Sequence, residues 1–149
     1  MNKILASNKK ANLKYQKVEC FEAGVKLLGT EVKSIKAGRA SLDGAYVIIR
    51  GGEAYLVDAT IPAWQAGNVS KSYEVNRPRK LLLSKNQLLE LGEYEGRKGL
   101  AIVAFSLYNK KGLIKLEVCV GKNKNQRDRR QDIKKRDTQR DLKREIKYR

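Results

Sequence analysis

The chain has 149 residues, enough for one domain with a substantial core, and its 33 Lys and Arg residues outnumber 16 Asp and Glu residues to leave a net charge of +17. It has no run of ~18 apolar residues and no signal-peptide pattern at its start, so we expect a cytoplasmic protein without a membrane span. A positive surplus of this size favours nucleic acid as the partner; an anionic membrane surface and an acidic protein are the alternatives.

The sequence contains no histidine, so the commonest general base is missing and no Ser–His or Cys–His nucleophile pair can form. No Walker-type phosphate loop occurs, and no pair of carboxylates has a spacing that indicates acid–base catalysis. The only cysteines, Cys20 and Cys119, are too few ligands for a zinc site. We therefore predict a protein that is not an enzyme, needs no metal or cofactor, and keeps both cysteines as free thiols packed like small apolar groups.

The first predicted elements are a strand and a short helix. Residues 18–28 are rich in apolar and β-branched side chains and indicate a strand. A helix is predicted over residues 30–37, with Thr30 as its N-cap, Glu31 in its first turn and Gly38 as its C-terminal stop. Ahead of both, residues 8–11 are polar and basic, which fits either a phosphate contact or a solvated terminus.

A hairpin is predicted next. Residues 45–50 and 53–58 are rich in β-branched and aromatic side chains, and they flank Gly51 and Gly52. Two glycines in the turn supply the positive φ that a type I′ turn requires, so the three segments together indicate two antiparallel strands.

A long loop, a helix and a second hairpin complete the predicted body. Residues 61–79 hold both prolines and few apolar side chains, and loops of this length are often functional. Ser84 begins a capping box for a helix that we expect to stop at Gly92. Residues 100–108 and 113–120 then form the second hairpin through the four residues from Asn109 to Gly112. The predicted fold is mainly β: an OB-like antiparallel β-barrel with short peripheral helices.

Charge separates residues 1–120, with net charge +9, from residues 121–149, with 13 basic and 5 acidic side chains and net charge +8. The second segment has too little apolar area to offset the entropy of ordering. Acidic and basic side chains at helical spacing, such as Asp132 and Arg136, nevertheless favour a helix on binding. We therefore predict a disordered basic tail that folds on its target; a merely solubilising tail is the alternative.

Several residues of the body are candidates for RNA contact. Arg79 and Lys80 directly precede the apolar run that contains Leu82, and basic residues beside an apolar strand suit a groove that follows the phosphates of RNA. Leu82 itself fits a place in the core at least as well as a place in an RNA contact. Glu22 fits either a turn cap or an acceptor for a base edge. Trp64, in the long loop, either stacks on a base or packs as a lid on the barrel.

Six short motifs in a fixed order give the chain a specific resemblance. They are Asn-Lys-Lys-Ala at 8–11, Phe-Glu-Ala-Gly at 21–24, Gly-Thr-Glu-Val-Lys-Ser at 29–34, Ala-Gly-Arg at 37–39, Arg-Lys-Leu-Leu-Leu at 79–83, and Asp-Arg-Arg at 128–130 followed by residues 132–136. Each is weak alone, but together they span nearly the whole chain. The chain resembles the SmpB (small protein B, SsrA-binding protein) family of bacteria.

The resemblance implies an adaptor of trans-translation. Such a protein binds the tRNA-like domain of transfer-messenger RNA (tmRNA) and delivers it to 70S ribosomes stalled without a sense codon. Its tail would enter the empty mRNA channel of the small subunit and fold as a helix near the decoding centre. We expect a monomer with no membrane partner.

The resemblance, together with the basic patches, gives two sets of expected site residues. Asn8, Glu22 and Leu82 match the family's tmRNA-binding positions, and the full expected RNA-binding set is Asn8, Lys9, Lys10, Glu22, Arg39, Arg79, Lys80, Leu82, Lys122 and Lys124. The expected decoding-centre set is Arg127, Asp128, Arg129, Arg130, Ile133, Lys134 and Lys135. Arg127 stands where the family often has an aromatic or His, and a guanidinium can stack on a base as they do.

Two other functions compete with this one. A general single-strand RNA-binding OB protein would tolerate any oligonucleotide instead of preferring a folded tRNA-like elbow. A carboxylate- and Mg²⁺-dependent nuclease would need a concentrated acidic cluster, which the sequence lacks.

Overall fold

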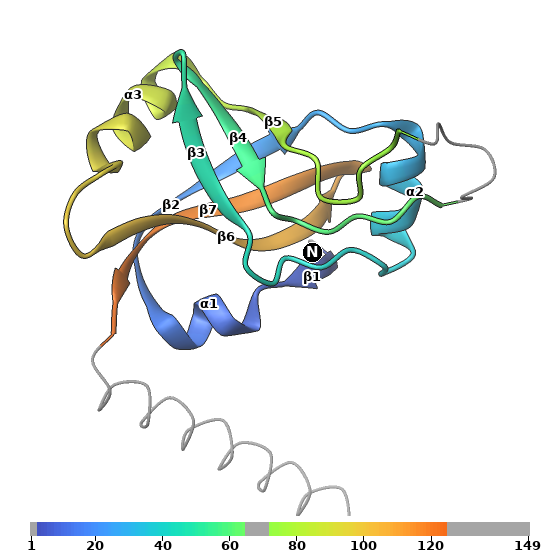
Figure 1. Ribbon diagram of the computed structural model, residues 1–149, viewed down its shortest axis with the longest axis horizontal. Coiled ribbons are helices and arrows are strands. Elements are labelled where there is room, and N and C mark those ends of the chain that lie inside the picture. Colours follow the sequence, from blue (N-terminus) through green and yellow to red (C-terminus); the bar gives the residue numbers. More distant parts are fainter. Residues whose placement is uncertain (1–2, 65–71, 125–149) are drawn as a thin grey trace, which may run out of the picture.

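The computed structural model describes residues 3–64 and 72–124, so the predicted decoding-centre residues lie outside the described residues. Ten elements follow one another along the chain (Figure 1). They are β1 (Lys3–Ser7), α1 (Lys9–Lys14), β2 (Tyr15–Val25), α2 (Gly29–Lys36), β3 (Tyr46–Arg50), β4 (Glu53–Val57), β5 (Arg79–Leu82), α3 (Lys85–Tyr94), β6 (Leu100–Lys110) and β7 (Leu113–Asn123).

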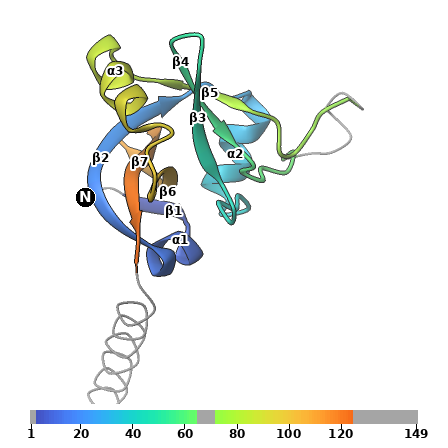
Figure 2. The same ribbon diagram turned by 60° about the vertical axis from the view of Figure 1, so that its left-hand side comes forward.

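The strands form one antiparallel sheet that closes into a ring. Their order is β1-β6-β3-β4-β5-β2-β7, and β7 pairs back with β6. β1 pairs with residues 106–109 of β6, and β3 pairs with the same strand at Val103. The three helices lie apart from one another around this ring in both views (Figures 1 and 2). The prediction of a mainly β, closed antiparallel fold with short helices is therefore confirmed. No helix of the described residues is long and apolar enough to cross a membrane.

Both predicted hairpins are confirmed, and the second is tighter than expected. Gly51 and Gly52 have φ values of 59° and 76°, as the type I′ turn requires. The second turn consists of Lys111 and Gly112, with φ values of 51° and 82°, because β6 continues to Lys110. The four-residue turn predicted there was wrong, since Lys111 adopts the left-handed conformation that sequence alone disfavours for lysine.

Both predicted helices form, with shifted ends. α2 begins at Gly29, so Leu28, not Thr30, is the N-cap residue, and its N–H donates to the Glu31 carboxylate at 2.8 Å. The expected Thr30 cap was therefore wrong. Ser84 caps α3 as predicted, accepting from the Gln87 N–H at 3.2 Å. α3 continues past Gly92 to Tyr94, so the predicted stop was wrong.

The structure corrects the state of the two cysteines: Cys20 and Cys119 are joined in a disulfide, so the predicted free thiols were wrong. They lie directly opposite each other on β2 and β7, with their Cα atoms 4.0 Å apart. Their positions in the sequence differ by 99, and only the strand register brings them together. The bond covalently links the two strands beneath α1, where Cys119 packs in a small buried cluster with Phe105.

A buried ion pair lies at the centre of the fold. Glu31 of α2 and Arg79 of β5 have no exposed side-chain surface, and Arg79 Nη2 lies 2.7 Å from Glu31 Oε2. The other guanidinium bonds of Arg79 go to the Ala59 and Val75 carbonyls, at 2.8 Å and 2.9 Å, and to the Tyr73 hydroxyl, at 3.3 Å. Arg77 also donates to Glu31. This network ties α2 to β5 and to both ends of the 61–79 segment.

The charge on Glu31 is held by its partners. Burial raises the pKa of this carboxyl, but hydrogen bonds from Arg77, the Leu28 N–H and Arg79 lower it by more, so its net pKa lies below the ordinary value. The pair therefore stays ionised at neutral pH, and its stabilisation is lost only as the pH falls through the acid range.

Replacing Glu31 with Gln should lower the free energy of unfolding by about 3–5 kcal/mol, because Arg79 is left buried and uncompensated. Urea denaturation at neutral pH measures this. The matched control is Glu117→Gln, which removes the partly exposed Lys17–Glu117 pair and should cost less than about 1 kcal/mol. Equal losses for the two variants would contradict the central role of the buried pair.

Candidate nucleic-acid interface

One exposed face of the barrel gathers three of the expected RNA-binding residues, Glu22, Lys80 and Leu82. Glu22 and Gly24 point to the same side of β2, and Leu82 of β5 is paired opposite Gly24. We call this surface the Glu22 face and define it by Glu22, Lys80, Leu82, Tyr108, Lys110, Leu113 and Lys115.

Glu22 is held in place by neighbours from β6. The Tyr108 hydroxyl donates to its carboxylate at 2.6 Å, and Lys110 Nζ lies 3.2 Å from both oxygens. The hydrogen bond from Tyr108, followed by that from Lys110, lowers the pKa of Glu22. Burial and the bond to Glu22 raise the pKa of Tyr108. Glu22 is therefore a fixed, ionised acceptor, which suits recognition of a base-edge amine.

Leu82 is 55% exposed, so the expectation that it fits the core was wrong and the alternative of a contact residue agrees with its position. It lies over Gly24, where an added Cβ would come within 3.1 Å of the Leu82 Cβ. A shallow hollow beside it is lined by Gly24, Leu113 and Lys115 among others, and Leu113 is itself 61% exposed. Because Gly24 has no side chain, Leu82 can lie close over it, and the two exposed leucines form an apolar patch beside the Glu22 carboxylate.

Lys80 lies on the same side of β5 as Leu82. Its Nζ contacts Glu53 at 2.8 Å, and that hydrogen bond raises its pKa. Both side chains are substantially exposed, so a phosphate can compete with Glu53 for the lysine. Lys80 therefore adds a cation to the rim of the Glu22 face.

Two expected contact residues are buried and cannot touch RNA in this structure. Arg79 has no exposed surface and is bound to Glu31. Asn8 is 2% exposed: its Oδ1 accepts from the Ala11 N–H at 3.1 Å to cap α1, and its Nδ2 donates to the Ala104 carbonyl at 2.9 Å. Their burial gives no support to direct contact with RNA, because a basic or polar side chain is identified by type in the sequence while its burial depends on tertiary partners.

The remaining expected residues lie elsewhere. Lys9 and Lys10 are exposed on α1, and Lys122 lies at the end of β7, where Lys124 Nζ donates to the Asn12 carbonyl at 3.1 Å. Arg39 follows α2 and lies 4.7 Å from the ring centroid of Trp64. One face of the Trp64 ring is thus occupied by protein, in line with its interpretation as a packed lid.

Sequence reasoning did not single out Tyr108, Lys110, Leu113 or Lys115. The predicted hairpin of residues 100–108 and 113–120 indicated that these residues lie on or next to strands, but not which strands flank the hairpin. Their place beside Glu22 follows from the pairing of β6, β7 and β2. Within the described residues, no cluster of three or more Asp, Glu or Cys side chains is arranged to hold a metal ion.

Replacing Tyr108 with Phe should raise the pKa of Glu22 toward its ordinary value, because the largest stabilising hydrogen bond to the carboxylate is lost. A carbon-detected NMR titration of the Glu22 carboxyl measures the change. Tyr55→Phe is the control, since Tyr55 makes the same kind of bond to Glu53 at 2.8 Å and should leave Glu22 unaffected. An unchanged Glu22 titration in the Tyr108 variant would show that the hydroxyl does not hold this carboxylate.

Comparisons with known proteins agree with this geometry. The family model for SmpB protein matches residues 5–148. SsrA-binding proteins of Oleidesulfovibrio alaskensis and Clostridium tetani are 44% and 42% identical over 96% and 99% of this chain, and over 92% and 94% of their own lengths. A solved tmRNA–SmpB structure from the bacterial ribosome has a TM-score of 0.68 and 33% identity, covering 80% of this chain and 84% of that one. The chain therefore belongs to the SmpB family.

Proposed function

We propose that this protein is the RNA-binding adaptor of trans-translation, which binds the tRNA-like domain of tmRNA and delivers it to stalled ribosomes in the cytoplasm. Its relatives are SsrA-binding proteins, and the solved structure that it resembles is of tmRNA–SmpB. The observation that carries the proposal is the Glu22 face, which joins an ionised acceptor, exposed leucines and lysines on one barrel surface. We further propose that the closed ring of strands is the OB-like barrel expected of the family and that the protein is a monomer.

The chemistry of the Glu22 face fits a folded RNA better than a bare polyanion. A fixed carboxylate repels phosphates, yet it accepts hydrogen bonds from base amines. Exposed leucines pack against the apolar side of a base or ribose, while lysines neutralise flanking phosphates. No covalent bond is made or broken, and the protein acts by position alone.

The second part of the proposal concerns the C-terminal segment. We propose that it occupies the empty mRNA channel as a helix, with Arg127, Asp128, Arg129, Arg130, Ile133, Lys134 and Lys135 near the decoding centre. β7 continues through Gly121 to Asn123, which pairs with Tyr15, three residues into the segment assigned to the tail from sequence. The division between body and tail is therefore better drawn after Lys124.

A general single-strand RNA-binding function is the second candidate. A protein of that kind would bind RNA through charge alone, and the carboxylate of Glu22 would make no contribution. Comparing its affinity for a folded RNA with its affinity for an unfolded RNA distinguishes the two functions.

Replacing Leu82 with Ala should weaken binding of the tRNA-like domain about tenfold, as expected for loss of a central apolar contact. Fluorescence anisotropy at about 150 mM salt measures the affinity, and this concentration limits nonspecific charge binding. Leu89→Ala on α3 is the control, because Leu89 is 63% exposed but lies outside the Glu22 face. Both variants should have the melting temperature of the unmodified protein. If the two variants bind the tRNA-like domain with equal affinity, Leu82 is not part of the interface.

Truncation after Lys124 should leave binding of the tRNA-like domain within about threefold and abolish peptide tagging on stalled ribosomes. The complete β7 keeps the body folded, while the segment assigned to the ribosome is removed. A filter-binding assay and a reconstituted tagging assay measure the two activities. A body that loses RNA binding as severely as tagging would contradict this division of labour.

A further inference from the structure

The disulfide lies beside an irregular point of the ladder between β2 and β7. Cys20 and Cys119 are paired directly opposite each other. A shift of register follows between residues 17 and 19 of β2. Past this shift, residues 15–17 pair with residues 121–123 and form a short end of the ladder. The disulfide therefore fastens the two strands directly before this short end.

The short end of the ladder carries α1 on one strand and Lys124 on the other. α1 leads without a break into β2 at Tyr15. The Lys124 N–H donates to the Lys14 carbonyl at 2.9 Å, and Lys124 Nζ donates to the Asn12 carbonyl at 3.1 Å. The residue that precedes the C-terminal segment of residues 125–149 is thus attached to α1.

α1 is a short helix with a narrow hold on the barrel. Of its six residues only Ala11 is buried, and Ala11 packs in one cluster with Cys119 and Phe105. Asn8, which caps the helix, donates to the Ala104 carbonyl at 2.9 Å. A helix of this length is not stable without such tertiary contacts. The packing of Cys119 therefore bears directly on the stability of α1.

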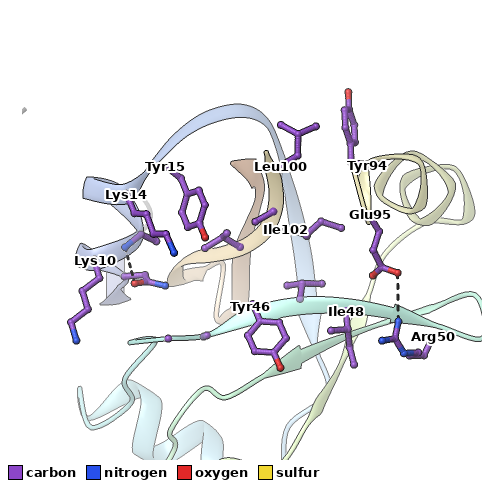
Figure 3. A pocket seen from close by; sticks show the side chains of 18 residues that line it. Lys10, Lys14, Tyr15, Tyr46, Ile48, Arg50, Tyr94, Glu95, Leu100 and Ile102 are labelled. Carbon is purple, nitrogen blue, oxygen red and sulfur yellow. Dashed lines mark hydrogen bonds and ion pairs between the residues drawn. The ribbon is translucent and has the colours of Figure 1, made fainter. Parts of the chain in front are cut away.

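A pocket borders α1 on another side. It has a volume of about 680 Å³ and lies between α1, β3, β6 and the end of α3 (Figure 3). Figure 3 shows Lys10 and Tyr15 on the same side of this pocket. Ala11 and Val103 belong both to the pocket lining and to the cluster that contains Cys119. A small shift of α1 toward the pocket therefore meets no packed side chains.

The two sulfur atoms of the disulfide differ in access. Cys20 is an exposed residue of β2, whereas Cys119 has no exposed surface. An attacking thiolate can therefore reach the bond only from the side of Cys20. Once the bond is broken, the two sulfur atoms must separate to van der Waals contact, and Cys119 then presses on its close-packed cluster beneath α1.

We propose that the Cys20–Cys119 disulfide is a reversible redox site, and that its reduction by a dithiol loosens α1 and the attachment of Lys124. The inference rests on the proposed function for its cytoplasmic setting, where disulfides are mostly transient or redox-sensing. The firmness with which the body holds the start of the C-terminal segment then follows the thiol balance of the cell.

The exchange proceeds in two steps. One thiolate of the dithiol attacks the Cys20 sulfur and forms a new S–S bond there, while the original bond breaks and its electron pair leaves on the Cys119 sulfur, which takes up a proton. The second thiolate attacks the reductant's own sulfur in this mixed disulfide, closes the reductant's disulfide and releases Cys20, which is also protonated. Two electrons and two protons pass from the dithiol to the protein. A small-molecule disulfide reverses both steps.

The first test locates the attacked sulfur. The full chain is oxidised with glutathione disulfide, treated with reduced glutathione, quenched with a maleimide and mapped by mass spectrometry. Glutathione should be found on Cys20 and the maleimide on Cys119. Glutathione on Cys119, a bond that reacts only after unfolding in urea, or two free thiols in the oxidised chain would overturn the proposal.

The second test measures the hold on α1 by NMR hydrogen exchange on the full chain. Reduction with dithiothreitol should speed exchange of the Asn12 and Lys124 amides about tenfold, because their hydrogen bonds depend on α1. The Leu88 amide, which donates to the Ser84 carbonyl at 3.0 Å in α3 outside the Cys119 cluster, is the internal control. Unchanged exchange, or equal acceleration of all three amides, would contradict the proposed loosening of α1.

A variant separates loss of the bond from other effects of the reductant. Cys20→Ser prevents the bond at an exposed position and leaves Cys119 in its cluster, so its Asn12 and Lys124 amides should exchange at the rate of the reduced chain with or without dithiothreitol. Val18→Ser, at a residue of the same strand that is 52% exposed, is the control and should keep the response to the reductant.

Slow exchange of these amides in Cys20→Ser would show that the bond does not hold α1 and would overturn the proposal. None of these measurements involves RNA. A negative result for the redox site therefore leaves the proposed function of the Glu22 face untouched.

Discussion

The buried pair of Glu31 and Arg79 organises the molecule, because each charge is tolerable inside the barrel only with the other present. Arg79 begins β5, the strand that also carries Lys80 and Leu82. With the Arg79 side chain drawn inward, the pleat directs Lys80 and Leu82 outward on one side. A requirement of the core thus sets the position of the exposed residues that we assign to RNA.

The two ends of β2 differ in their surroundings. At one end, the ionised Glu22 lies beside exposed leucines, a combination that suits selection by hydrogen bonding and by shape. At the other end, Tyr15 lies against Gly121 of β7. The disulfide between Cys20 and Cys119 links β2 to β7 between these two ends.

The parts of this structure that local chemistry determines could be predicted from the sequence. The glycine pair at 51–52 specified its hairpin, and Ser84 specified its helix start, because both act through their own backbone neighbours. The order of the six short motifs along the chain indicated the family. The closed antiparallel fold followed from the number and spacing of short strands.

What the sequence could not provide is long-range pairing and burial. Arg79 and Asn8 were expected at the surface, and their burial depends on Glu31 and on the Ala104 carbonyl, both far away in the chain. The disulfide and the Tyr108–Glu22 bond likewise exist only through register, and α1 was missed because its sequence has no apolar periodicity.

We propose that the body recognises a folded tRNA-like RNA and does not simply neutralise phosphates. A competition between labelled tmRNA and unlabelled ordinary tRNA, repeated at several salt concentrations, tests it most directly. We expect the preference for tmRNA over tRNA to persist as salt rises, because charge attraction weakens for both RNAs while the specific contacts remain. A preference that disappears at about 150 mM salt would show instead that the protein binds RNA as a general polycation.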